Sequence, residues 1–144
     1  MITDKFLRVS DAQAVTTTAV STNTIDLSVN RDIGEGNGLY MNFVVGTAFA
    51  GGTSVQFEII VADDAALTSN VQVVGASPVV ATAGLTAGHS EAVRMNPQIG
   101  ALGKRYAGAR YTVVGTMTAG TVTADVVETI QDGKKFYASG FTVA

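Results

Sequence analysis

The chain has 144 residues, a length that fits one domain, and carries a net charge of −3 at pH 7 with no cysteine. The lack of cysteine excludes disulfide frameworks, zinc–thiolate sites and cysteine nucleophiles. Its basic pairs are Lys104 with Arg105 and Lys134 with Lys135. Nucleic-acid binding needs clustered positive charge, so we expect no nucleic-acid partner.

Charged residues make up 15% of the chain, against about 25% in a typical soluble domain. Thr, Ser, Asn, Gln and Gly take their place, which predicts a weakly charged surface able to pack on a neighbour. No stretch approaches the roughly 18 apolar residues of a membrane span, and residues 1–13 lack the apolar run of a signal peptide. We therefore expect a protein made in the cytoplasm, without a membrane partner.

Apolar residues recur with a period of two, which is typical of half-buried strands. The segment 10–22 is rich in Ala and Thr, and its β-propensity favours order. A short strand is expected over residues 91–95, within an otherwise irregular stretch from 83 to 104. Longer strands are expected over residues 25–29, 39–45, 53–62, 106–117 and 121–130.

Glycine marks the expected turns. Residues 50–52 predict a tight hairpin between the strands over 39–45 and 53–62, and residues 118–120 predict another between the last two strands. Pro78 and Pro97 suit strand starts or edges. Residues 63–68 are the best helix candidate, about one or two turns long, with Asp63 as the N-cap.

These features predict one all-β domain over residues 1–144, an antiparallel sandwich or barrel with minimal helix. Chain termini are loose unless they are tied down. We therefore expect terminal arms over residues 1–10 and 134–144.

The candidate catalytic residues are few. His89 is the only histidine, and a Ser-His-Asp triad would have to use it with the adjacent Ser90. No nucleophile elbow accompanies them, so a surface histidine is the simpler interpretation. Asp63 and Asp64 are an adjacent carboxylate pair without a calcium-loop pattern, which favours helix capping over metal binding. We expect no enzyme activity, no metal and no cofactor.

Two further patterns suggest chemistry. Gly34, Gly36 and Gly38 precede a predicted strand, whereas a dinucleotide fingerprint needs a helix there, so they read as turn residues. Glycosidases use two positioned carboxylates, and three acidic residues of the predicted strands could face one cleft. Those residues, which serve equally as solvent-facing side chains, are Glu58, Asp125 and Glu128.

Apolar residues near the two ends are the candidate interface. Phe and Tyr are favoured at interface cores, and terminal arms can reach beyond a compact sandwich. The alternative for the C-terminal group is a last strand packed in the sheet. The candidates are Phe6 and Leu7 near the N-terminus and Phe136, Tyr137 and Phe141 near the C-terminus.

Several segments share their order and texture with one known family: residues 10–15, 21–27, 31–36, 105–106, 110–113 and 118–124. Together they resemble the tailed-bacteriophage capsid cement, or decoration, proteins. The resemblance covers nearly the whole chain and includes no catalytic motif.

The resemblance implies a jelly-roll sandwich that binds the outer surface of a shell of major capsid proteins with the HK97-type fold. It also implies a homo-oligomer, with a dimer favoured over a trimer, which stabilises contacts between capsid subunits in the virion. Two alternatives remain: a glycan-binding sandwich module of a tail fibre or adhesin, and a β-sandwich hydrolase that uses Glu58.

Overall fold

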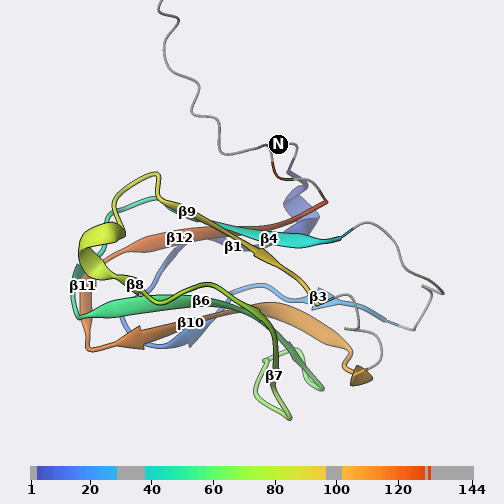
Figure 1. Cartoon of the computed structure of the whole chain (residues 1–144). Coiled ribbons are helices and arrows are strands. Elements are labelled where there is room, and N and C mark those ends of the chain that lie inside the picture. Colours follow the sequence, from blue (N-terminus) through green and yellow to red (C-terminus); the bar gives the residue numbers. More distant parts are fainter. Residues whose placement is uncertain (1–2, 29–37, 97–101, 129, 131–144) are drawn as a thin grey trace, which may run out of the picture.

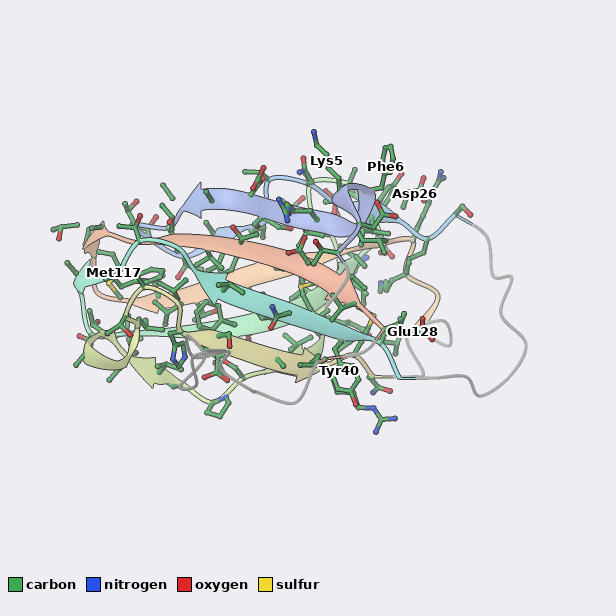
Figure 2. The ribbon with its side chains drawn as sticks, turned by 90° about the horizontal axis from the view of Figure 1, so that it is seen from above. Lys5, Phe6, Asp26, Tyr40, Met117 and Glu128 are labelled. Atoms are coloured by element: carbon green, nitrogen blue, oxygen red, sulfur yellow. The ribbon has the colours of Figure 1, made fainter. Side chains whose placement is uncertain are left out.

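The computed structural model describes residues 3–28, 38–96, 102–128 and 130. These residues form two antiparallel sheets that pack face to face (Figure 1). Sheet A has the order β1-β12-β4-β9, from Arg8–Ala14, Thr121–Val127, Tyr40–Val45 and Ser90–Arg94. Figure 2 views this sheet from above.

Sheet B has the order β2-β10-β6-β7, from Ala19–Val20, Tyr106–Val114, Ser54–Ala62 and Gln72–Ala76. Two short strands extend it: β3 (Ile25–Asp26) pairs with β10, and β8 (Val80–Ala81) pairs with β6. Counted along the chain, with β2 and β3 taken together, the eight principal strands are β1, β2/β3, β4, β6, β7, β9, β10 and β12. In this count sheet A has the order 1-8-3-6 and sheet B has the order 2-7-4-5. This is the arrangement of a jelly roll, so the predicted antiparallel, jelly-roll-like sandwich is confirmed.

Alternate residues of β6 face the core, although the other face of this strand is also mostly buried. Its inward side chains belong to one buried cluster that fills the space between the sheets. Phe57 and Tyr111 from sheet B meet Phe43 from sheet A, with ring centroids 5.2–6.1 Å apart. The core residues that β6 contributes are Val55, Phe57, Ile59 and Val61.

The two predicted hairpins are wrong. Residues 50–52 lead from β4 in sheet A to β6 in sheet B, and residues 118–120 lead from β10 in sheet B to β12 in sheet A. Both connections therefore cross between the sheets at one end of the sandwich, where β5 (Ala50–Gly51) pairs with β11 (Met117–Ala119). The glycines are needed because Gly51 and Gly52 have φ angles of 71° and 54°.

The predicted helix over residues 63–68 is also wrong, because that segment is a turn. Asp64, rather than Asp63, is the capping side chain and accepts hydrogen bonds from the backbone N–H groups of Thr68 and Ser69. Among the described residues, helical structure consists of the 3₁₀ turns η1 (Lys5–Leu7) and η2 (Thr82–Gly84) and of Leu102, which also has 3₁₀ conformation.

Several expected boundaries shift. Residues 8–10 of the expected N-terminal arm lie in β1, where Ser10 is buried. The strand over 25–29 is limited to β3 among its described residues, and Leu39 is exposed just before β4. Pro78 follows β7 and precedes β8. The strand expected over 91–95 is confirmed as β9, whereas Pro97 and the arm over 134–144 lie outside the described residues.

Candidate functional site

The three candidate carboxylates do not share a cleft. Glu58 lies on the outer face of sheet B, because its neighbours Phe57 and Ile59 point into the core. Asp125 lies on the outer face of sheet A, between the inward residues of β12. Glu128 follows β12 at one end of the sandwich (Figure 2). The paired-carboxylate geometry of a glycosidase is therefore not formed by these residues.

Glu58 is nevertheless held in a defined cluster. Its Oε2 atom accepts hydrogen bonds from Arg110 Nε at 2.7 Å and from the Thr112 hydroxyl at 2.6 Å. Burial raises the pKa of Glu58, but the bonds from Arg110 and Thr112 outweigh burial and hold the pKa below its usual value. The carboxylate is thus stabilised in its charged form, whereas a general acid needs a raised pKa.

This cluster predicts acid-sensitive stability. A lowered pKa in the folded state stabilises the fold above the unfolded-state pKa, and the contribution is lost as pH falls through the folded-state pKa. We expect the free energy of unfolding to fall as the pH drops below the usual glutamate pKa, and to fall less in Glu58→Gln. Urea unfolding across this range measures both slopes, and equal slopes would contradict the assigned role of Glu58.

Asp125 is paired with the neighbouring strand. Arg8 of β1 donates from Nε to Asp125 Oδ1 at 2.8 Å and also contacts Asp11. Asp125 is 4% exposed, so the ion pair covers most of its side chain. Arg8 therefore fixes the start of β1 against β12, which is a structural role.

His89 does not form a triad. Its Nε2 atom lies 2.9 Å from Glu91 Oε1, and no described hydroxyl is hydrogen-bonded to its ring. Ser90, the adjacent residue, is exposed on β9. The histidine thus pairs with a carboxylate at the edge of sheet A.

The loop after β6 closes part of the outer face of sheet B. Asp63 contacts Lys104 and Asn70, and the pKa of Asp63 lies below its usual value mainly because Lys104 donates to it. The loop buries Leu67, which is 2% exposed, against Ile60. These contacts give both Asp63 and Asp64 a role in shaping the loop.

A buried polar network was not predicted from the sequence. The Tyr111 hydroxyl of sheet B donates to Ser10 Oγ of sheet A at 2.7 Å, and Ser10 donates to Gln13 Oε1. Burial raises the pKa of Tyr111, which keeps the phenol neutral and able to donate. The network ties the two sheets together, and its only signal in the sequence is polar residues within strand-like segments.

Exposed apolar side chains gather at one end of the sandwich. Figure 2 shows Phe6, Tyr40 and Glu128 at this end and Met117 at the opposite end. The backbone places further leucines there, because Leu27 N–H donates to the Arg105 carbonyl and the Leu39 carbonyl accepts from Met95 N–H. We call this surface the apolar end; its exposed members are Phe6, Leu7, Leu27, Leu39 and Leu102.

Phe6 is the most exposed of these side chains, at 93%. It is held in η1, where the Asp4 carboxylate accepts from Phe6 N–H and the Asp4 carbonyl accepts from Leu7 N–H. An ordered backbone thus presents an uncovered aromatic ring. Such a ring, together with the exposed leucines at this end, is a candidate contact for another molecule.

Other predicted positions lie elsewhere. Gly38 precedes β4, so a strand follows the glycine run, as predicted. The remaining candidates, Gly34, Gly36, Phe136, Tyr137 and Phe141, lie outside the described residues.

Within the described ranges, no cluster of His, Asp or Glu side chains has the arrangement of a metal site. The same residues contain no helix long and apolar enough to cross a bilayer.

The jelly-roll core coincides with the part of the chain that a known family shares. The family model named Bbp16 matches residues 9–126, which begin in β1 and end in β12. No curated protein sequence matches the chain. The family match covers well over half of the chain, so this protein belongs to the phage-associated Bbp16 family.

Proposed function

We propose that the chain is a capsid cement protein, which binds the outer surface of a phage head and stabilises contacts between major capsid proteins of the HK97-type fold. Membership of a phage-associated family supports a role in the virion. The observation that carries the binding role is the apolar end, with Phe6 uncovered on an ordered turn. A well-packed domain that leaves such a surface open is suited to docking on another protein.

The proposed mechanism is physical rather than chemical. A filled head is under outward stress, and a protein bound across a seam between subunits must lose its contacts before the seam opens. A homo-oligomer, with a dimer favoured over a trimer, would hold several sites at once, and tethered sites act at a high effective concentration. Each contact can therefore be modest. Synthesis would take place in the cytoplasm of the host bacterium.

Binding to heads tests this proposal. Purified chain is added to heads from a phage that lacks its gene, and the bound fraction is measured after sedimentation. We expect saturable binding at a fixed number of copies per head. Phe6→Asp should weaken it by about tenfold or more, because a buried aromatic anchor commonly contributes over 1 kcal/mol.

Val114→Asp is the matched control. Val114 is also exposed and apolar, but it ends β10 at the opposite end of the sandwich from Phe6. We expect this variant to bind like the wild type. Equal losses of head binding in Phe6→Asp and Val114→Asp would contradict a docking role for the apolar end. Failure of the wild type to bind heads would contradict the cement function itself.

A further inference from the structure

The outermost strand of sheet A, β9, has a regular ladder with β4. Met95 N–H donates to the Leu39 carbonyl, and Val45 N–H donates to the His89 carbonyl. Hydrogen-bonded and non-bonded pairs alternate in an antiparallel ladder. The non-bonded pairs are therefore Tyr40 with Arg94, Asn42 with Ala92 and Val44 with Ser90.

The backbone groups of Ser90, Ala92 and Arg94 consequently point away from β4, toward the free edge. All three residues are exposed, and no described residue forms a hydrogen bond with these edge groups. At one end of the edge β7 crosses closely, because a Cβ atom built on Gly75 would lie 2.7 Å from the Arg94 carbonyl oxygen. The open groups are thus those of Ser90 and Ala92 and the N–H of Arg94.

The other edges in the described structure are closed or irregular. In β1, two register shifts and a φ of 45° at Ala12 break the ladder, and Asn23 N–H donates to the Val9 carbonyl. The strands β2 and β3 have two residues each, and β7 has a register shift. Bulges and short strands protect edges from pairing, and β9 has neither.

We propose that a second copy of this chain pairs with β9 through its own β9, antiparallel, about a two-fold axis at Ala92. In this register Ala92 exchanges two hydrogen bonds with Ala92 of the second copy. The N–H of each Arg94 donates to the Ser90 carbonyl of the other copy. Such an interface uses the same patch on both subunits, as a two-fold dimer requires.

The side chains suit this register. Arg94 lies opposite Ser90, Glu91 lies opposite Val93, and Ala92 lies opposite itself, so no like charges face each other. Glu91 occupies the core side of the edge, beside His89, where a charged group discourages unselective strand addition. Small side chains at the centre let the two backbones approach closely.

Figure 1 shows β9 at the border of sheet A, with β8 of sheet B below it. The inference locates the oligomer contact of the proposed function and rests on that function only for its use on a head.

Sedimentation of the purified full chain over a concentration series tests the pairing. We expect a dimer for the wild type and a dissociation constant raised by about tenfold or more in Ala92→Pro, which removes two hydrogen bonds. The Ala92 N–H faces away from β4, so proline should leave the fold intact. Ala92→Val keeps the N–H and should remain dimeric.

Two charged variants test the β9 pairing without introducing proline. Ala92→Glu and Ala92→Lys each place like charges opposite each other across the axis, so each alone should associate more weakly than the wild type. An equimolar mixture should form a heterodimer. A monomeric wild type, or variants that dimerise like the wild type, would overturn the pairing; binding of heads by monomers would leave the cement function standing.

Discussion

Phe57→Ala is expected to lower the free energy of unfolding by about 3–5 kcal/mol. The Phe57 ring is 1% exposed, lies 5.2 Å from the Phe43 ring of the opposite sheet and contacts Tyr111 edge-on. Removing the ring leaves a cavity between the sheets and also loses buried apolar area. A domain of this size is stable by about 5–15 kcal/mol, so the change is a large fraction of the total.

Phe6→Ala is the matched control, since it makes the same chemical change at a side chain that is 93% exposed. Surface substitutions of this kind stay within about 0.5 kcal/mol. Urea unfolding followed by circular dichroism measures both variants. Similar midpoints for the two variants would contradict the placement of Phe57 at the centre of the core.

Leu67→Ala is expected to destabilise the protein by about 2–5 kcal/mol, although it lies in a loop. Leu67 has a φ of 57°, which is rare for a bulky residue. The backbone is held there because the side chain packs closely over Gly108, where a Cβ atom would lie 2.5 Å from Leu67 Cδ1. Alanine keeps the strained backbone and loses the burial that offsets it.

Leu27→Ala controls for this change, because Leu27 is 37% exposed. Its expected loss is smaller than that of Leu67→Ala, because more than a third of the Leu27 surface is already exposed to water. Thermal unfolding of the two variants side by side checks the difference. Equal melting temperatures would mean that the loop does not cover sheet B as described.

The sequence predicted the strands better than their connections. The strand over residues 53–62 was predicted from its apolar residues, which the structure buries on both faces of β6. The core covers one face, and the loop around Leu67 covers part of the other. The segment around Gly51 and Gly52 has the composition of a hairpin, yet it leads from one sheet to the other. A glycine turn supplies positive φ angles in both cases, so composition alone does not distinguish them.

The expected helix is absent for a local reason and a long-range reason. Asp64 holds the loop by accepting from Thr68 and Ser69, and this competes with helix formation. Burial of Leu67 then decides the conformation, which depends on residues distant in sequence, such as Gly108. The helix propensity of residues 63–68 does not take that long-range contact into account.

The candidate interface stays a prediction. Phe6 and Leu7 are exposed, and the aromatic C-terminal candidates lie outside the described residues. Leu27 and Leu39, from the segments expected as strands over residues 25–29 and 39–45, belong to the apolar end as well. The open edge of β9 was not predicted, because an edge is a property of strand order rather than of composition. The small side chains of Ser90 and Ala92 are the only sequence feature that points to this edge.

The apolar end and the β9 edge differ in the kind of contact that they offer. The apolar end offers a ring on an ordered turn, and the β9 edge offers backbone groups in a regular register. Both depend on the rigid jelly roll, whose core and Tyr111 network fix the sheets in place. We propose that the first contacts the shell and the second joins two copies, so that a pair spans neighbouring sites.

The cement function is tested most directly by the temperature at which heads release DNA. Heads that lack the chain are compared with the same heads after purified chain has been added back and the bound copies counted. We predict a lower release temperature without the chain and full recovery when its sites are filled. Unchanged release at full occupancy would contradict a stabilising role.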